Sequence, residues 1–178
     1  MKKSSALAYV GHNANGDREK DDFYPTPENA TQSLLDKQKF EGNIWECACG
    51  NGAMSKVMIK NGYDVYSSDL INRDYGETGV DFLESDRQVD NIVTNPPFKL
   101  ATEFTVKALE LANNKVALLN KLSFLEGIKR RNQVFNHKKL EKVLVFTKRI
   151  KFGGNGLMAF AWFIFDVNYN GKPQIDWI

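Results

Sequence analysis

Four consecutive residues, Asn95-Pro96-Pro97-Phe98, bring together groups that can act on a flat, conjugated amine. The lone pair of such an amine is delocalised into its ring, so the nitrogen attacks a methyl donor only when acceptors on its hydrogens favour a more tetrahedral geometry. Asn95 offers an amide oxygen and Pro96 a backbone carbonyl, and the two prolines restrict φ, which fixes these acceptors before a substrate arrives. Phe98 offers a flat wall, and base–aromatic stacking contributes roughly 1–3 kcal/mol. The tetrapeptide therefore predicts methyl transfer to an amine.

These groups converge only if a strand delivers them, and the short apolar run Asn91–Thr94 before the tetrapeptide predicts one. A second unit lies upstream. Its order along the chain is a strand over Asn43–Ala48, the turn Gly50-Asn51-Gly52, a helix over Ala53–Lys60 and a strand over Tyr63–Ser68 that ends in Asp69. Strand, glycine turn, helix, strand and acid form the first unit of an open α/β nucleotide-binding sheet.

The residues of the glycine turn indicate which ligand this unit binds. Gly50 and Gly52 let the backbone approach a ligand closely, and Asp69 follows at close to the ~20-residue spacing of a ribose-binding carboxylate. The turn is not G-x-G-x-x-G, and Glu46 would repel a phosphate but suits a cation. S-adenosylmethionine carries an ammonium and a sulfonium and no phosphate, so it fits this pattern. The structural alternatives are a surface acid for Glu46 and a loop cap for Asp69.

With these motifs in this order, the chain resembles the class I S-adenosylmethionine-dependent methyltransferases, above all small phage or prophage DNA adenine-N6 enzymes, over about Phe23 to Ile178. The resemblance implies that Asp81 and Phe82 hold the adenine of the cofactor. It also implies that Tyr24-Pro25-Thr26-Pro27 closes over the cofactor carboxylate. The implied cofactor-binding residues are Tyr24, Thr26, Pro27, Glu46, Gly50, Gly52, Asp69, Leu70, Asp81, Phe82 and Asn95. The implied catalytic residues are Asn95, Pro96, Pro97 and Phe98.

The charge of the chain is concentrated in one segment. Lys129 to Lys151 contains nine Lys or Arg and one acid, Glu141, a net of +8, which leaves −6 for the rest of a chain whose formal net charge is +2. A basic region on an otherwise acidic chain predicts a polyanion partner, although a solvated helix face is the ordinary alternative. The stretch Phe146–Gly154 resembles the family motif in which an aromatic packs near the target base, so Phe152 or Phe146 is implied there. The predicted nucleic-acid-binding residues are Lys129, Arg130, Arg131, Lys148, Arg149, Lys151 and Phe152.

The remaining pattern predicts the rest of the fold. Further helices are expected over Glu28–Lys39, Ala101–Ala112 and, less regularly, Gly127–Lys139; further strands are expected over Lys115–Leu119, Lys142–Thr147, Leu157–Val167 and Gln174–Ile178, the last two paired as an antiparallel hairpin. The predicted fold is α/β, a Rossmann-like class I methyltransferase sheet that is mostly parallel, with an antiparallel C-terminal hairpin and helices on both faces. Residues 1–22 are expected to form a flexible arm, and residues 23–178 a single catalytic domain without a separate target-recognition domain.

Composition sets the cellular context. Hydrophobic content of 42% and charged content of 26% are ordinary for a soluble protein. No apolar run approaches the ~20 residues of a membrane span, so a cytoplasmic protein without membrane contact is expected, in the host cytoplasm if a phage encodes it. Cys47 and Cys49 have no histidine neighbours and are expected to pack as reduced thiols, with no metal site.

Several functions remain open from the sequence. DNA is the expected partner, with RNA as an alternative, and the protein is expected to be a monomer or homodimer. The Asn-Pro-Pro motif also occurs in enzymes that methylate RNA bases or protein glutamine, since a planar amide nitrogen poses the same chemical problem. A decoy that binds cofactor or DNA without turnover is a further alternative. Within the favoured interpretation, methylation of adenine would serve restriction-modification.

Overall fold

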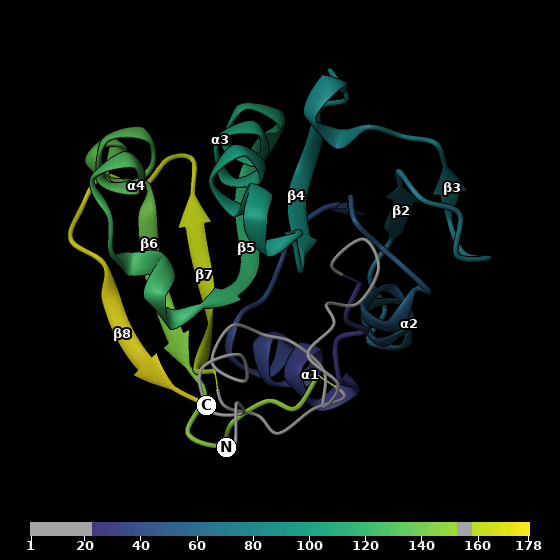
Figure 1. The fold of residues 1–178 in the computed structure, drawn as a ribbon, viewed down its shortest axis with the longest axis horizontal. Coiled ribbons are helices and arrows are strands. Elements are labelled where there is room, and N and C mark those ends of the chain that lie inside the picture. The colour runs from purple at the N-terminus through teal and green to yellow at the C-terminus, as the bar shows by residue number, and fades with distance from the viewer. Residues whose placement is uncertain (1–22, 153–157) are drawn as a thin grey trace, which may run out of the picture.

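The computed structural model describes residues 23–152 and 158–178, which build one eight-stranded sheet with helices packed on it (Figure 1). The arm expected over residues 1–22 lies outside the described residues. The helices are α1 (Glu28–Lys37), α2 (Ala53–Lys60), α3 (Ala101–Leu111) and α4 (Ile128–Gln133), with 3-10 turns η3 (Phe82–Glu84), η4 (Phe98–Leu100), η5 (Leu122–Leu125) and η6 (Phe135–His137). The strands are β1 (Ile44–Glu46), β2 (Val65–Asp69), β3 (Glu77–Thr78), β4 (Val89–Thr94), β5 (Ala112–Lys121), β6 (Leu140–Val145), β7 (Phe160–Asp166) and β8 (Gln174–Trp177).

The strands are ordered β3-β2-β1-β4-β5-β7-β6-β8. From β3 to β5 neighbouring strands are parallel, and β1 has β2 on one side and β4 on the other. The chain therefore winds outward in two directions from β1, which makes the gap between β1 and β4 a topological switch point. In open α/β sheets, ligands bind at such a point, outside the carboxyl ends of the strands.

The antiparallel element at the C-terminal end of the sheet is confirmed, but the prediction that the last two strands pair with each other is wrong. The strand β7 lies between β5 and β6 and is antiparallel to both, whereas β8 pairs parallel with the outer side of β6. Every residue from Phe160 to Phe165 is buried. A strand that is apolar on both faces gains most from a central position, and that burial outweighs the local connection to β8.

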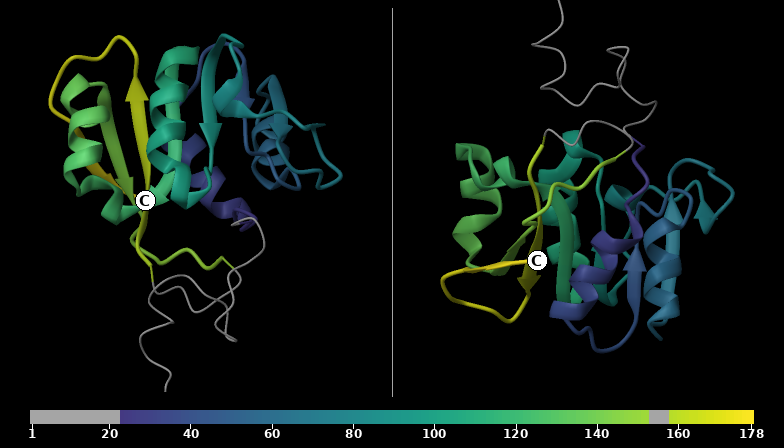
Figure 2. Two further views of the ribbon diagram at one scale, coloured as in Figure 1. Left: turned by 45° about the horizontal axis from the view of Figure 1, so that its top comes forward. Right: turned by 90° about the horizontal axis from the view of Figure 1, so that it is seen from below.

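Helices cover both faces of the sheet, as expected, with α3 and α4 on one face and α1 and α2 on the other (Figure 2). Leu34 of α1 and Met58 of α2 pack with Val93 and Ala117 of the central strands, while Phe104 of α3 packs with Ile92 on the opposite face. Among the described residues, each helix is too short or too polar to cross a bilayer.

The predicted helix boundaries agree best with the structure where residues that start or stop helices, such as glycine, flank the helix. The helix α2 spans Ala53–Lys60 as predicted, between Gly52 and Asn61. The helix α1 ends at Lys37 because Gln38 is already extended, with φ −133°. The irregular stretch 127–139 resolves into α4 and η6, which meet at Val134, where φ is −122°.

Candidate functional site

A cavity of about 630 Å³ opens at the carboxyl ends of β1, β2 and β4, at the switch point of the sheet. It runs from the glycine turn at Gly50 to the Asn95 tetrapeptide and joins the two sites that the sequence predicted separately. The predicted residues that line it are Tyr24, Thr26, Glu46, Gly50, Asp69, Leu70, Asp81, Phe82, Asn95, Pro96, Pro97 and Phe98. The predicted residues Pro27 and Gly52 are not in its wall; they lie at the starts of α1 and α2.

Asp69 ties the end of β2 to the glycine turn. Its Oδ2 accepts a hydrogen bond of 2.8 Å from the Gly50 amide, and its Oδ1 accepts one of 2.9 Å from the amide of Ile71. Gly50 has φ +55°, and the Phe23 ring occupies the space that a Cβ there would need. The carboxylate is therefore held at the cavity wall with a fixed orientation, as a hydroxyl-binding acceptor requires.

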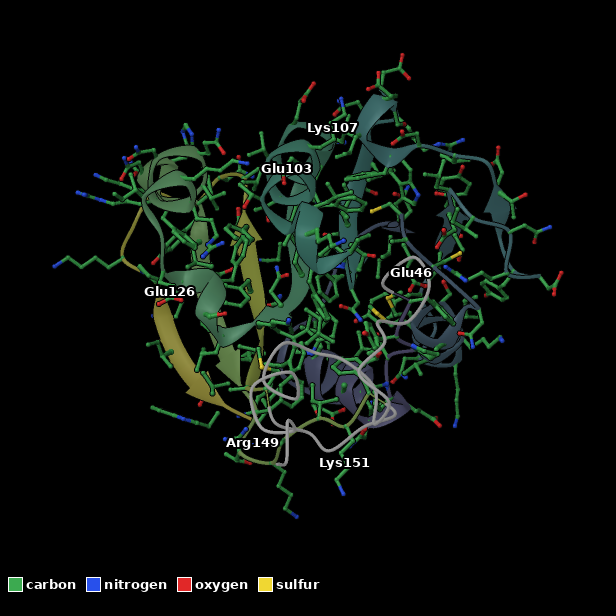
Figure 3. All side chains as sticks on the ribbon, viewed as in Figure 1. Glu46, Glu103, Lys107, Glu126, Arg149 and Lys151 are labelled. Carbon is green, nitrogen blue, oxygen red and sulfur yellow. The ribbon has the colours of Figure 1, made fainter. Side chains whose placement is uncertain are left out.

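Glu46, at the end of β1 and labelled in Figure 3, is only 2% exposed. The Ser55 hydroxyl of α2 donates a hydrogen bond to its Oε2, and the Ser55 and Ser67 hydroxyls lie 2.6 Å apart. Burial raises the pKa of Glu46 to about 8, against the lowering effect of the Ser55 hydrogen bond, and the nearby Asp69 charge raises it further. The carboxyl is thus mostly protonated at neutral pH until a cation arrives to favour its ionised form.

Asp81 and Phe82 share the wall of the cavity but differ in what holds them. Asp81 is exposed, and its Oδ1 accepts a hydrogen bond of 3.0 Å from the Leu83 amide at the start of η3. The Phe82 ring is 2% exposed and packs on Trp45 and Phe104, with centroids 5.2 and 4.9 Å away. Most of the Phe82 ring therefore belongs to the core, and only part of it faces a ligand.

Apolar surface on this side of the cavity also comes from Val80 and Leu83, which the sequence reasoning missed. Both are ordinary aliphatic residues, Val80 just before η3 and Leu83 within it, and no spacing sets them apart. Phe23 and Arg73 were missed as well. The Arg73 guanidinium lies 4.1 Å from the centroid of the Phe23 ring, and both residues line the cavity.

Asn95 presents an unpaired acceptor. Its Nδ2 donates a hydrogen bond of 3.1 Å to Oγ1 of Thr26, while its Oδ1 is buried and has no hydrogen-bond partner among the described residues. A buried acceptor left unpaired costs about 1–3 kcal/mol. An N–H group of a ligand at this wall would remove that cost, which makes Asn95 Oδ1 the atom best prepared for a donor.

Aromatic rings surround the far end of the tetrapeptide. The Phe98 ring lies 6.1 Å from Tyr24 with an interplanar angle of 24°, and 5.6 Å from Phe160. The Lys121 ammonium sits 4.8 Å from the centroid of the same ring. Phe152 contacts Tyr24 and Phe160 but does not line the cavity. This end of the cavity can therefore receive a flat ring.

The predicted basic residues fall into two separate groups. In the helix α4, the Lys129 ammonium forms an ion pair of 2.6 Å with Glu103 and thereby lowers the pKa of that carboxyl. The Arg130 guanidinium donates to the Glu126 and Ser123 carbonyls, and Arg131 is exposed.

The second group consists of Lys148, Arg149 and Lys151, which are exposed in the segment after β6. Figure 3 places Arg149 and Lys151 at the lower edge of the view, whereas Figure 1 shows α4 at the upper left. The chain reaches Phe152, in contact with the cavity residue Tyr24, directly after Lys151. The second group therefore leads directly to a residue in contact with the cavity wall, whereas Lys129 of the first group is tied to Glu103 in the first turn of α3.

No protein-family model and no curated protein sequence matches the chain. Its structure is similar to that of a protein assigned as the modification subunit of a type I restriction enzyme from Vibrio vulnificus, with a TM-score of 0.66 and 15% identity over 88% of this chain and 47% of that one. It is also similar to a protein assigned as an RNA methyltransferase from Pyrococcus horikoshii, with a TM-score of 0.65 and 16% identity over 90% of this chain and 94% of that one.

A third similar structure is magnesium protoporphyrin IX methyltransferase from Synechocystis with bound S-adenosylmethionine, with a TM-score of 0.55 and 12% identity over 78% of each chain. The chain spans about half the length of the Vibrio protein. At these identities the likeness shows the fold, and the fold is that of the class I methyltransferases, as the sequence predicted.

Proposed function

We propose that this chain transfers a methyl group from S-adenosylmethionine to the exocyclic N6 amine of adenine in DNA. The observation that carries the proposal is the buried Oδ1 of Asn95, which residues 23–152 and 158–178 leave without a hydrogen-bond partner, in the wall of a cavity that Gly50, Asp69 and Glu46 also line. One end of the cavity offers the Asn95 oxygen as a hydrogen-bond acceptor. The other end offers Glu46, which suits a cation, and Asp69, which suits hydroxyl groups.

The residues present fit the cofactor. Buried Glu46 suits its positive charge, Asp69 suits its ribose hydroxyls, and the positive φ of Gly50 brings backbone close to the ligand. Asp81, with the apolar Val80 and Leu83, suits its adenine. When bound, the cofactor supplies a methyl group on a positively charged sulfur.

At the other end of the cavity, Asn95 and Pro96 would orient the adenine amine that receives the methyl group. Asn95 Oδ1 would accept a hydrogen bond from one N–H of the adenine amine, and the backbone carbonyl of Pro96 would accept from the other. With both hydrogens held, the nitrogen lone pair turns toward the methyl group, and fixed dipoles of this kind contribute roughly 10²–10³ in rate each. The N–C bond would form as the S–C bond of the cofactor breaks, which would leave a neutral thioether, and the cationic methylated nitrogen would then lose a proton to water. No side-chain base is needed for this order of events.

DNA is favoured as the substrate by two observations together. The exposed cations Lys148 and Lys151 lie in the segment that leads to Phe152, which contacts the cavity residue Tyr24, and the similar Vibrio protein is assigned to a restriction enzyme. RNA is the second candidate, because the similar Pyrococcus protein is assigned as an RNA methyltransferase and a basic face serves either nucleic acid. Protein glutamine and a non-catalytic decoy are outcomes that the same experiment separates.

The test uses the full chain with tritium-labelled S-adenosylmethionine on unmethylated DNA, RNA and cell protein, followed by digestion and mass analysis of the nucleosides. We expect label in N6-methyladenine from DNA. Label on protein alone would overturn the nucleic-acid assignment, and label on RNA alone would move the proposal to the second candidate. Asn95→Ala should abolish the transfer and change the cofactor Kd less than about twofold, since it removes a transition-state contact.

A further inference from the structure

Four aromatic rings around the target end of the cavity form a closed cycle of contacts. Tyr24 contacts Phe98 at 6.1 Å and Phe152 at 6.4 Å between centroids, and Phe160 contacts Phe98 at 5.6 Å and Phe152 at 4.8 Å. The four rings come from the segment before α1, from η4, from the segment after β6 and from β7. Each ring of the cycle therefore has two aromatic neighbours.

Within the cycle, two rings face the cavity and two support them. Tyr24 and Phe98 line the cavity, whereas Phe152 and Phe160 do not. Phe160 is 6% exposed and backs Phe98, and Phe152 meets Tyr24 edge-on at 72°. The rings that a ligand can touch are therefore Tyr24 and Phe98.

The mutual geometry of these two rings suits a third ring between them. Their planes are only 24° apart, with 6.1 Å between centroids, so the two rings are stacked on each other and present nearly parallel faces. A flat ring held between two others needs about 7 Å from wall to wall, twice an ordinary carbon–carbon contact of ~3.5 Å. A ring can therefore enter between them only if Tyr24, which comes from a segment outside the sheet, moves away from Phe98 as the ring binds.

We propose that Tyr24 is the second wall of the target-base site and stacks on the adenine opposite Phe98. This inference rests on the proposed function and deepens it. The family resemblance implies that Tyr24 binds the cofactor carboxylate and that Phe152 packs near the target base. The inference gives Tyr24 the contact with the base instead. Phe152 here supports Tyr24 from behind.

The neighbouring contact of the same segment agrees with this role. Two residues after Tyr24, the Thr26 hydroxyl accepts the hydrogen bond from Asn95 Nδ2. A single short segment thus supplies one wall for the base and the partner that orients the amide for the base's amine. The segment acts on the target side of the cavity.

The test measures base preference without turnover. Fluorescence anisotropy with labelled oligo(dA) and oligo(dT), in the presence of S-adenosylhomocysteine, gives the ratio of their Kd values for the wild-type chain, Tyr24→Leu, Tyr24→Phe and Phe152→Leu. We expect a wild-type preference for oligo(dA) on the order of tenfold, lost in Tyr24→Leu, kept in Tyr24→Phe and partly lost in Phe152→Leu. Calorimetry should find the same affinity for S-adenosylhomocysteine in all four. Tyr169→Leu, in the β7–β8 connection at the other edge of the sheet, is the matched control.

The outcomes separate this inference from the proposed function. Three results would contradict the stacking role of Tyr24. They are a wild-type chain without adenine preference, a Tyr24→Leu chain that keeps the preference, and a Tyr24→Leu chain that loses cofactor affinity. If wild type transfers no methyl group to DNA and Tyr24→Leu still abolishes the oligo(dA) preference, the proposed function is wrong but the stacking role of Tyr24 is supported. If DNA adenine is methylated and Tyr24→Leu matches wild type in both binding assays, the proposed function is supported and the stacking role of Tyr24 is wrong.

Discussion

Asn95 donates a hydrogen bond through Nδ2 to Oγ1 of Thr26, 3.1 Å away, although 69 positions separate the two residues in the chain. Thr26 is 6% exposed and lies just before α1, so its hydroxyl is held by the packing of that helix. The bond anchors the Asn95 amide at Nδ2, so in this arrangement Thr26 occupies the donating end of the amide. The end left over is the oxygen, which is the end that methyl transfer to an amine requires.

Thr26→Val should lower kcat roughly 10- to 100-fold, because an amide free to rotate presents its oxygen only part of the time. Thr26→Ser, which keeps the hydroxyl, should restore most of the rate. The matched control is Thr31→Val in α1. Within the described part of the chain the buried Thr31 hydroxyl has no hydrogen-bond partner, so its removal should leave the rate unchanged and the protein at least as stable. A Thr26→Val enzyme with wild-type kcat in single-turnover assays would contradict the orienting role.

The sequence predicted the unit from β1 to β2 well because its punctuation is local. Glycines bound the turn and α2, and an acid ends the next strand, so each boundary is visible within a few residues. The conformation of the tetrapeptide Asn95–Phe98 could be predicted equally well, since proline restricts the backbone whatever surrounds it. These residues do meet at one cavity, because the carboxyl ends of neighbouring parallel strands share an edge of the sheet.

What failed or was missed depends on contacts between distant segments. The central place of β7 follows from burial against both β5 and β6, which no local pattern reveals. The basic segment looked continuous in sequence, but β6 runs through it and separates Lys129 from Lys151. The contact between Tyr24 and Phe152 joins the first and a late part of the described chain, and aromatic residues at such separation carry no spacing signal.

Glu46 makes the stability of the unliganded protein depend on pH. Its pKa is raised to about 8 in the folded state, from 4.5 as the ordinary value, so the folded state binds the proton more tightly than the unfolded state. The free energy of unfolding should therefore be highest below about pH 4.5 for this group and fall as pH rises toward about 8, by an amount on the order of a few kcal/mol. Urea unfolding at several pH values measures this slope.

Glu46→Gln supplies the control, because an amide resembles the protonated carboxyl and does not titrate. Its slope over the same pH range should be flatter than that of the wild type. Cofactor affinity should behave in the opposite way and rise with pH in the wild type, since a cationic ligand favours the ionised carboxylate. A wild-type stability that rises with pH relative to Glu46→Gln would contradict the raised pKa.

Gly52 is required by the turn for two separable reasons. Its φ is +76°, and the Tyr75 ring fills the place of a Cβ; Gly62 has φ +87° but nothing within 4 Å of that place. Gly62→Ala should therefore lose only the backbone term of about 1–2 kcal/mol, whereas Gly52→Ala should lose more in thermal or urea unfolding. Combining Gly52→Ala with Tyr75→Ala tests the ring directly. Equal losses in the two single variants would show that the ring moves aside without cost.

The two basic groups should differ in what they contribute to DNA binding. Lys148 and Lys151 are exposed in the segment that leads to Phe152 at the cavity, whereas Lys129 and Arg131 belong to α4, where Lys129 already pairs with Glu103. Each phosphate contact contributes about 0.9 to the slope of log K against log salt concentration for duplex DNA. The double variant Lys148→Ala/Lys151→Ala should lower that slope by up to about 1.8, and the matched pair Lys129→Ala/Arg131→Ala should change it little. Binding titrations over a range of salt concentrations decide this, because a larger effect from the α4 pair would place the DNA along α4 instead.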